Sequence, residues 1–246
     1  MNRVSVDRVS KSFEDGAVQA LKDVDFAVEN GEFVCIVGPS GCGKTTLFRI
    51  IAGLDDATSG EVLLSGDPVT EPTPELGIVF QEYHLFPWRT VRENIAFGLE
   101  QQGLGKAERA KRVDELIELV GLTGFGDTYP ADLSGGMKQR VGIARALAVD
   151  PELLLMDEPF GAVDAQTRDM LHDELLDVWS KTGKTVLFVT HDVEEAVTLA
   201  DRIVVMSRGP GSVREIVDVD LPRPRSRTDD AFAEVQEHVL RLIQES

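Results

Sequence analysis

The sequence predicts an α/β fold, with a core built on a buried parallel sheet, an antiparallel β subdomain and an inserted α-helical lobe. Three observations support this prediction. Near the N-terminus, apolar residues alternate with polar ones, which is typical of antiparallel strands with one face in water. Several later runs are continuously apolar, as strands buried on both faces are. Between residues 81 and 150 the apolar spacing becomes helical, and few strand candidates remain.

The strands and the first helix follow from these patterns in chain order. Alternation over residues 4–9 and 24–28 predicts two antiparallel strands. Residues 33–37 are all apolar and predict a central buried strand. A glycine-rich loop follows, and residues 45–52 have a helical pattern. Further buried strands are expected at residues 76–80, 153–156, 185–189 and 203–206.

The remaining segments are helical or irregular. Residues 107–120 and 137–148 predict two helices of the inserted lobe. The run Pro222-Arg223-Pro224-Arg225 predicts a turn or an extended linker, and residues 232–243 have the spacing of an amphipathic helix. We therefore expect one domain over residues 1–246. Its parts are a core with the β subdomain (1–80 and 151–221), a helical lobe (81–150), and a C-terminal linker and helix (222–246).

Composition limits the class of protein. A chain of 246 residues that is 42% hydrophobic can bury the core of one α/β domain with an inserted lobe. Lys and Arg total 25 against 43 Asp and Glu, so the net charge of -18 repels phosphate backbones, and we do not expect nucleic acid as a partner. The acidic residues are scattered along the chain, which suggests a halophilic protein adapted to high salt.

The cysteines and the hydropathy bear on location. Cys35 lies in an apolar run and Cys42 in the glycine-rich loop, without the spacing of a metal or redox site. We expect both thiols to be reduced, as in a cytosolic protein. No apolar run approaches the roughly 18 residues of a membrane span, and the N-terminus lacks the core of a signal peptide. The chain is expected to be soluble, or to reach a membrane only through a partner.

The glycine-rich loop between the first buried strand and the first helix matches the phosphate-binding P-loop pattern in full. Its glycines let backbone amides converge on phosphate oxygens, and the helix N-terminus adds its positive end. Lys44 would neutralise phosphate charge, and Thr45 would offer a hydroxyl to Mg²⁺. A tight turn without a ligand is the alternative. The predicted nucleotide-binding residues here are Gly38, Pro39, Ser40, Gly41, Cys42, Gly43, Lys44, Thr45 and Thr46.

A later apolar run, at residues 153–156, ends in the acidic pair Asp157-Glu158. Strand ends are where an α/β sheet presents groups to ligands. We expect Asp157 to hold the metal through its water shell and Glu158 to polarise the attacking water as a general base. An acidic cap on a helix or turn is the alternative. Beside the P-loop, the pair predicts a P-loop NTPase core.

The segment Leu133-Ser134-Gly135-Gly136-Met137 is the most informative stretch of the chain. A P-loop enzyme of general type needs the loop and the carboxylates, but it does not need a second Ser-Gly-Gly turn before its acidic strand. Such a turn opens a helix and forms a second anion site. We expect that site to bind a nucleotide held by another subunit.

On these motifs the chain resembles, over nearly its whole length, the ATP-binding cassette subunit of an ABC transporter. Leu133-Ser134-Gly135-Gly136 resembles the family's signature motif, although the family most often has Gln at the position of Met137. The resemblance implies a P-loop NTPase (RecA-like) core, with ATP and Mg²⁺ as ligands. It also implies a head-to-tail homodimer, in which Ser134, Gly135 and Gly136 grip the γ-phosphate of ATP held by the other subunit.

Other positions resemble further sites of this family. Gln81 resembles the Q-loop glutamine that touches Mg²⁺ or water, and His191 resembles the switch histidine that contacts the γ-phosphate. Asp164, in Gly161-Ala162-Val163-Asp164, resembles the D-loop aspartate, and Phe13 resembles the aromatic residue that stacks on adenine. The alternatives are a surface glutamine, a hydrogen-bonded histidine and a core phenylalanine. The implied catalytic residues are Glu158, His191 and Gln81, and the implied metal ligands are Thr45, Gln81 and Asp157.

The resemblance extends to one group of importers. Importer cassettes receive a helix of the membrane subunit near the Q-loop, where residues 81–90 form an aromatic and apolar run. A packed corner of the helical lobe is the alternative. Residues 85–91, Met137 and residues 221–225 resemble the branch for nitrate, sulfonate, taurine and bicarbonate, with carriers of thiamine or riboflavin precursors as related cassettes.

The implied function is ATP hydrolysis that drives uptake of a small solute. The implied partners are polytopic membrane permease subunits and, indirectly, an extracytoplasmic substrate-binding protein, with the chain peripheral at the cytoplasmic face of the membrane. A cassette ATPase of DNA maintenance or translation is the second hypothesis, but the chain lacks the long coiled coil or the second cassette that those classes carry. A P-loop kinase or GTPase would leave residues 133–137 and His191 unexplained.

Overall fold

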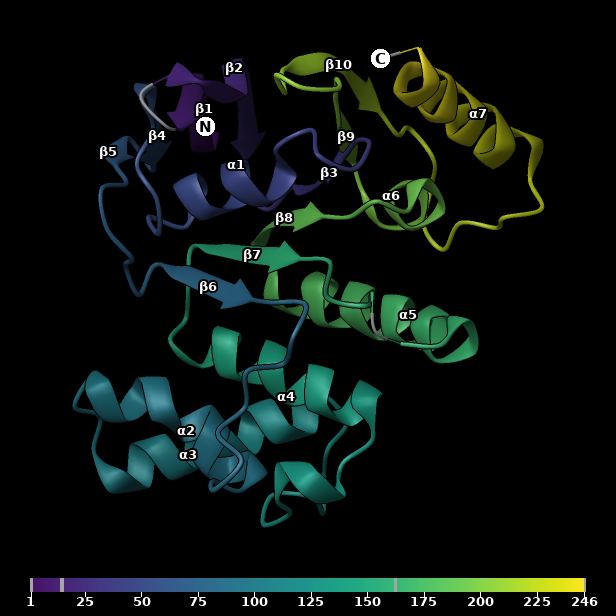
Figure 1. Ribbon diagram of the computed structural model, residues 1–246. Helices are drawn as coiled ribbons and strands as arrows, with labels where there is room; N and C mark the ends of the chain where they lie inside the picture. Colours follow the sequence, from purple (N-terminus) through teal and green to yellow (C-terminus); the bar gives the residue numbers. More distant parts are fainter. Residues whose placement is uncertain (1, 14–15, 162, 246) are drawn as a thin grey trace. The chain divides into compact units, whose positions relative to one another are not determined.

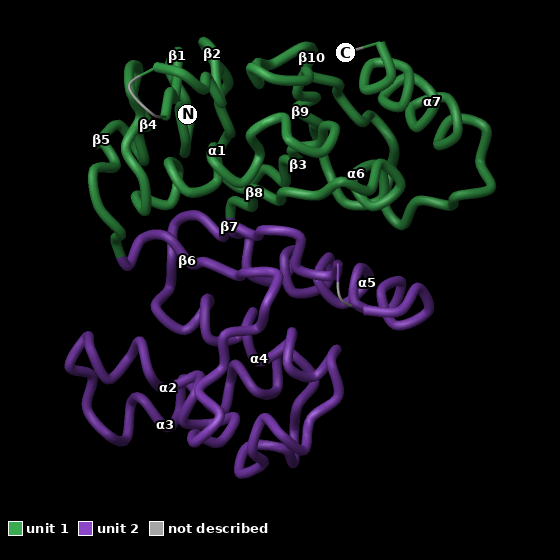
Figure 2. The backbone as a smooth tube through the Cα atoms, viewed as in Figure 1, with its two compact units in different colours: residues 1–73, 185–246 green, residues 74–184 purple. Residues whose placement is uncertain are grey.

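The computed structural model describes residues 2–13, 16–161 and 163–245. The chain divides into two compact units, which are drawn in different colours in Figure 2. The first contains residues 1–73 and 185–246, and the second contains residues 74–184. The predicted division at residues 80, 150 and 221 remains a prediction.

An antiparallel sheet in the first unit has the strand order β2-β1-β4-β5 (Figure 1). In the pair β1–β2, Val4 lies opposite Val28 and Val6 lies opposite Phe26. These four side chains are buried, whereas their neighbours in β1 are half-buried or exposed, so the alternating pattern is confirmed. The strands are β1 (Asn2–Phe13), β2 (Val18–Glu29), β4 (Ser59–Leu64) and β5 (Asp67–Pro68).

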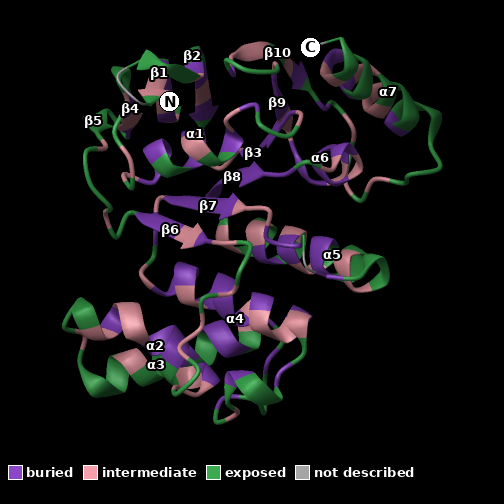
Figure 3. Cartoon of the chain, in the orientation of Figure 1, coloured by how far each residue is buried: buried purple, intermediate pink, exposed green. Residues whose placement is uncertain are grey.

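A second sheet of this unit has the order β10-β9-β3-β8. Strand β3 is parallel to β8 and β9, and β10 runs antiparallel to β9. All residues of β3 are buried, as its unbroken apolar run predicts (Figure 3). The elements are β3 (Phe33–Val37), α1 (Lys44–Ile51), β8 (Thr185–Val189), α6 (Val193–Leu199), β9 (Arg202–Met206), β10 (Val213–Asp218) and α7 (Asp230–Gln244).

The second unit combines a pair of parallel strands with helices. Strands β6 and β7 pair with Leu76 opposite Leu153 and Val79 opposite Met156. Residues 81–150 contain helices and no strand, which confirms the helical pattern of that segment. The elements are β6 (Leu76–Val79), α2 (Val91–Gln101), α3 (Lys106–Leu119), the short 3-10 helix Pro130–Asp132, α4 (Gly135–Ala148), β7 (Leu153–Asp157) and α5 (Ala165–Thr182).

Several elements have no counterpart among those expected from the sequence: β4, β5, β10, α2, α5 and α6. In β4 only Val62 and Leu64 are buried, which is too short an alternation to stand out. Helix α6 has seven residues, fewer than a periodic pattern needs. None of the described helices is long and apolar enough to cross a lipid bilayer.

Candidate functional site

The P-loop lies in the first unit, between β3 and α1. Gly41 and Gly43 have φ angles of 80° and 92°, in the left-handed region that glycine adopts without strain. A Cβ atom on Gly38 would lie 2.8 Å from Cys42 Sγ and 3.0 Å from Met206 Cβ. The loop conformation therefore requires glycine both for backbone angle and for close packing.

Lys44 is buried inside this loop. Its ammonium donates a hydrogen bond to the Gly38 carbonyl at 2.8 Å and to the Pro39 carbonyl at 3.3 Å. These bonds hold the charge inside the loop that matches the phosphate-binding pattern. Of the other predicted nucleotide-binding residues in the loop, Ser40, Gly41 and Thr45 are exposed, Pro39, Gly43 and Thr46 are half-buried, and Gly38 and Cys42 are buried.

Both cysteines are free and buried, as their spacing predicts. Burial raises the pKa of the Cys42 thiol, and the nearby Lys44 ammonium opposes part of that rise. Burial also raises the pKa of Cys35 well above its ordinary value. At neutral pH both groups are therefore protonated thiols, which behave as small apolar side chains.

His191 is exposed at the turn between β8 and α6, also in the first unit. The residues on either side of it are held by hydrogen bonds. The Thr190 amide donates to the Ile36 carbonyl at 3.1 Å, and the Thr190 hydroxyl donates to the Glu195 carboxylate. The Asp192 carboxylate caps α6 by accepting from the Glu194 and Glu195 amides at 2.9 and 3.3 Å. The imidazole is thus presented from a fixed backbone.

Phe13 lies at the end of β1, and its side chain is 39% exposed, so it is not a core residue. The Lys11 ammonium lies 5.1 Å from the centroid of the Phe13 ring and pairs with Asp55 at 2.7 Å. The hydrogen bond from Lys11 lowers the pKa of Asp55. The exposed ring can stack on a planar ligand, as its predicted role requires.

In the second unit, Gln81 and the acidic pair come from the carboxyl ends of β6 and β7, which are parallel neighbours. Asp157 is the last residue of β7, and both it and Glu158 are half-buried. Glu158 has a φ of 42°, in the left-handed region that is uncommon for residues other than glycine. Its carbonyl accepts a hydrogen bond from the Gly161 amide at 3.0 Å, which closes the turn. A Cβ on Gly161 would lie 3.1 Å from Gln81 Nε2, so the glutamine lies beside this turn.

The Ser-Gly-Gly turn opens α4, as its sequence predicts. Ser134 is the exposed N-cap residue, and its hydroxyl accepts a bond from the Met137 amide at 3.3 Å. A Cβ on Gly135 would lie 3.0 Å from Tyr83 Oη, and one on Gly136 would lie 3.2 Å from Thr167 Cγ2. The first turn contains no acidic residue, so no side chain there opposes an anion at this helix end.

Asp164 caps α5 by accepting a bond from the Thr167 amide at 3.0 Å, and this bond lowers the pKa of the carboxyl group. Thr167 therefore touches both Asp164 and the glycine turn at the start of α4. Ala162 of the predicted D-loop lies outside the described residues. The second unit thus brings the predicted signature and D-loop residues close together.

Comparison with known proteins decides the family. The family profile described as ABC transporter matches residues 21–161, which include the P-loop, the Ser-Gly-Gly turn and the acidic pair. The chain belongs to the ABC transporter family. The resemblance carried by its motifs is confirmed, and so is the expected fold class.

Individual relatives match nearly the whole chain. An uncharacterized ABC transporter ATP-binding protein of Methanocaldococcus jannaschii is 53% identical over 99% of this chain and 92% of its own length. An aliphatic sulfonates import ATP-binding protein, SsuB of Bacillus cereus, is 48% identical over 98% of this chain and 96% of its own length.

Solved structures agree with the fold. A dimeric ATP-binding cassette in a post-hydrolysis state with ADP and Pi has a TM-score of 0.75 at 34% identity, over 89% of this chain and 100% of that one. The protein cbiO1 of Clostridium perfringens, part of the ABC transporter complex cbiONQ, has a TM-score of 0.83 at 28% identity, over 99% of this chain and 95% of that one.

The aromatic run after Gln81 of this ABC protein is partly anchored and partly exposed. The Phe86 ring packs against Phe97, with centroids 4.7 Å apart, and against Trp88 at 5.7 Å. Trp88 itself is 72% exposed. The fully buried Asn94 fixes the loop, because its side-chain amide donates to the carbonyls of Phe86, Arg89 and Thr90, and its oxygen accepts from the Phe86 amide. Asn94 is a supporting residue that no motif in the sequence indicates.

A loop that is distant in sequence is bonded to the first turn of α2. The Val91 and Arg92 amides of α2 donate to the carbonyls of Thr128 and Gly126, both at 2.9 Å. The loop that contains those carbonyls presents Phe125 and Tyr129, which are 43% and 47% exposed. These aromatic residues have no helical or strand periodicity, so the sequence pattern gives no sign of their position.

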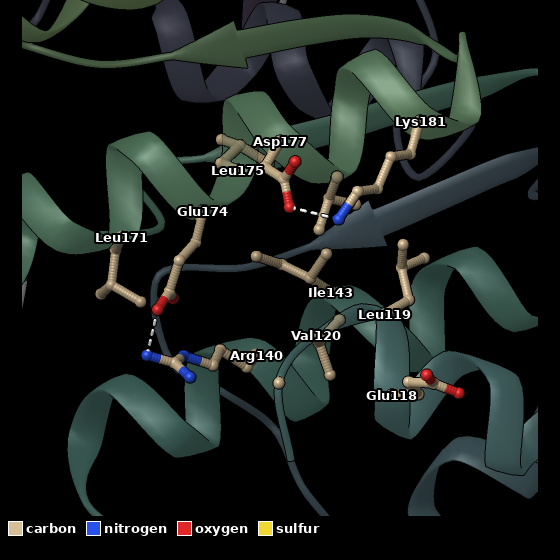
Figure 4. A pocket seen from close by; sticks show the side chains of 12 residues that line it. Glu118, Leu119, Val120, Arg140, Ile143, Leu171, Glu174, Leu175, Asp177 and Lys181 are labelled. Carbon is tan, nitrogen blue, oxygen red and sulfur yellow. Dashed lines mark hydrogen bonds and ion pairs between the residues drawn. The ribbon is translucent and has the colours of Figure 1, made fainter. Parts of the chain in front are cut away.

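A pocket of about 220 Å³ in the second unit is separate from the predicted site residues (Figure 4). It lies among the end of α3, α4 and α5, and four of its five charged side chains form two ion pairs. Arg140 pairs with Glu174, and Lys181 pairs with Asp177 at 2.6 Å. Burial raises the pKa of Glu174, an effect that Arg140 opposes. The paired charges leave the pocket without the cationic surplus that a nucleotide phosphate needs.

Proposed function

We propose that this ABC protein binds and hydrolyses ATP as the nucleotide-binding subunit of a membrane importer. The observation that carries the proposal is the presence in one chain of two glycine-rich helix N-termini that are suited to bind anions. One is the P-loop around the buried Lys44, and the other is the Ser134 turn at the start of α4. A P-loop enzyme that works alone has no use for the second.

The residues present fit a magnesium nucleotide. Thr45, Gln81 and Asp157 supply hydroxyl, amide and carboxylate oxygens, which are the hard ligands that Mg²⁺ prefers. They would hold the ion, and the bound ion would neutralise negative charge on the phosphate oxygens. The loop amides and Lys44 would bind the phosphates, and the exposed ring of Phe13 would stack on the adenine base.

Hydrolysis then follows from the acidic pair. Glu158 would accept a proton from water as that water attacks the γ-phosphorus, with ADP as the leaving group. His191 would contact the γ-phosphate from its fixed turn, and Gln81 would orient the water or the ion.

The second anion site implies a homodimer. Ser134, Gly135 and Gly136 would bind the γ-phosphate of ATP on the opposite subunit, with Asp164 nearby at the interface. The dimeric state of a solved cassette at 34% identity supports this arrangement. ATP binding would close the dimer, and hydrolysis would reopen it.

The exposed side chains of Trp88, Phe125 and Tyr129, with the half-buried Phe86 packed against Trp88, would receive a helix of a polytopic permease. Such a partner would place the subunit at the cytoplasmic face of a membrane. The name of the Bacillus cereus relative supports an anionic solute such as a sulfonate, with nitrate, taurine and bicarbonate as alternatives. An extracytoplasmic binding protein would deliver that solute.

The hydrolytic role is tested by replacing Glu158 with Gln. Because only the general base is removed, nucleotide affinity should stay unchanged while turnover falls by about 10²–10⁴-fold. Glu234→Gln, an exposed change in α7, is the matched control and should hydrolyse ATP normally. Turnover by Glu158→Gln at the wild-type rate would show that the general-base assignment is wrong.

The transport role is tested by affinity purification from detergent-solubilised membranes of the source cells. A polytopic membrane protein should co-purify with the wild-type chain, and Trp88→Ala should weaken its retention about tenfold, since exposed aromatic anchors dominate interfaces. Leu240→Ala, on an exposed part of α7, is the control and should leave the retention of the membrane protein unchanged. Co-purification of ribosomes or DNA instead would favour a role outside transport.

A further inference from the structure

The C-terminal strap, residues 221–228, lies along α6, the helix that follows His191. Three arginines alternate in the strap, at positions 223, 225 and 227, and each binds α6 or the residues at its end. The sequence predicts only a turn or a linker here, so these contacts assign a task to residues that the proposed hydrolysis does not use.

Arg225 caps the C-terminal end of α6. Its guanidinium donates to the carbonyls of Val197, Thr198 and Ala200 at 2.7, 3.4 and 2.6 Å. It also donates to the carbonyls of Leu221 and Val219 within the C-terminal segment, both at 3.1 Å. Burial lowers the pKa of Arg225 to about 10, so the side chain remains charged at neutral pH.

Arg223 completes the cap and ties it to the central strand. It donates to the Leu199 carbonyl at 2.5 Å and pairs with Asp201 at 2.6 Å. The other oxygen of Asp201 accepts from the Phe33 amide at 2.9 Å, at the start of the strand that leads into the P-loop. The carbonyls of residues 197–200, which a helix end leaves without intrahelical partners, are all bonded by these two arginines.

The strap also reaches the other end of the helix. Arg227 pairs with Glu194, in the first turn of α6, at 3.0 Å. That turn begins at Asp192, directly after His191, and its Glu195 carboxylate accepts from the Thr190 hydroxyl directly before His191. A helix of seven residues is too short to be stable alone in water. Its position, and that of the turn before it, therefore depends on external bonds.

We propose that the strap is a positioning element for His191: Arg223, Arg225 and Arg227 fix α6, and α6 fixes the turn that aims the imidazole at the γ-phosphate. The proposal rests on the proposed role of His191 in hydrolysis. Arg225 touches neither nucleotide nor water in this account, so it acts through the helix. Loosening the cap should move the histidine and slow the chemical step, with little effect on nucleotide affinity.

The test compares Arg225→Lys and Arg225→Ala with the wild-type full-length chain in ATPase assays. Lysine keeps the charge but lacks the guanidinium fork, so it cannot bond the α6 carbonyls through one nitrogen and the Leu221 and Val219 carbonyls through two others. We expect kcat to fall about 10- to 100-fold for both variants, because a small misplacement of a group that contacts the reacting phosphate slows the chemical step. The KM for ATP should stay nearly unchanged. Hydrogen exchange should accelerate at the amides of residues 190–199. Arg241→Ala, an exposed arginine of α7, is the matched control and should change neither quantity.

A double-mutant cycle separates positioning from a general loss of stability. In the His191→Ala background, Arg225→Lys should lower kcat no further, because the group that it positions is gone. The proposal would be overturned if Arg225→Lys lowered kcat by the same factor in the wild-type and His191→Ala backgrounds. It would also be overturned if both Arg225 variants had a normal kcat while His191→Ala had a low kcat. If Arg225→Ala does not fold, Arg225→Lys and Arg223→Lys give the same comparison. A normal kcat for His191→Ala would instead contradict the proposed role of the histidine, and the inference with it.

Discussion

At the scale of single residues, Gly211 limits the shape of the P-loop. Its amide donates to the Ala20 carbonyl at 2.9 Å and its carbonyl accepts from the Lys22 amide at 2.8 Å, which fixes it beside the loop. A Cβ at this position would lie 1.8 Å from the Cys42 carbonyl oxygen, so neither backbone could stay in place. Gly211→Ala should therefore weaken ATP binding and lower the free energy of unfolding by about 1–3 kcal/mol.

The measurement is chemical denaturation together with titration of a fluorescent ATP analogue. Gly142→Ala is the control, because Gly142 lies inside α4 and its added Cβ would meet nothing within 4 Å. It should raise the free energy of unfolding by about 0.5–1 kcal/mol, since alanine loses less backbone entropy in a helix. Unchanged nucleotide affinity in Gly211→Ala would show that the loop does not depend on this contact.

Single residues differ in how well the sequence predicts them. Lys44 and Ser134 belong to contiguous patterns with a direct physical meaning, and the structure places them in a P-loop and at a helix N-cap as expected. The left-handed backbone of Glu158 has no sequence signal, because glutamate is not a residue that favours that region. The bonds of Arg225 join residues far apart in sequence, and no local pattern encodes them.

At the scale of elements, the N-terminus of α4 has two tasks that one substitution can separate. Ser134 stabilises the helix as its cap, and we propose that it also binds a phosphate of the partner's ATP. Aspartate caps helices as well as serine does, so Ser134→Asp should keep the free energy of unfolding within about 0.5 kcal/mol. Its carboxylate would repel the γ-phosphate, and turnover should fall about 100-fold or more.

Steady-state ATPase assays and thermal unfolding measure the two effects. Gly105→Asp is the control, because Gly105 is the N-cap of α3, has ordinary extended angles, and has open space around its Cβ position. That variant adds the same charge to a helix end in the same unit and should hydrolyse ATP normally. A normal rate for Ser134→Asp would mean that the turn is only a helix cap.

The sequence predicts a helix or strand well when its pattern of apolar residues is long and regular. The unbroken apolar run of β3 and the alternation of β1 and β2 are visible in the sequence because burial repeats along the whole strand. Helix α5 has 18 residues, but only Leu171, His172, Leu175 and Val178 are buried. Many of its other residues are charged, so its apolar face is too narrow to predict a helix from the sequence. Helix α6 is formed by its caps, Asp192 at one end and the strap arginines at the other.

At the scale of the whole molecule, the net charge of -18 should make stability depend on salt. Like charges repel one another in the compact state, and the Debye length falls to about 3 Å in 1 M salt. We propose that the chain is adapted to such conditions, and its melting temperature should rise steadily from dilute buffer to molar potassium chloride. A Glu234→Gln/Glu237→Gln variant carries two fewer negative charges, so its melting temperature should rise less with salt than that of the wild-type chain. Equal melting temperatures in dilute and molar salt would rule out the adaptation.

The central proposal also belongs to this scale: we propose that the chain is catalytically incomplete alone, because its Ser-Gly-Gly turn would bind a nucleotide held by another copy. The most direct test is the mass in solution of Glu158→Gln, which should bind ATP without hydrolysing it. By light scattering, we expect 26.9 kDa without nucleotide and about twice that mass with Mg²⁺ and ATP. Adding Ser134→Asp to Glu158→Gln should leave a monomer that still binds ATP. A mass that stays at 26.9 kDa when Glu158→Gln is saturated with ATP would contradict the account.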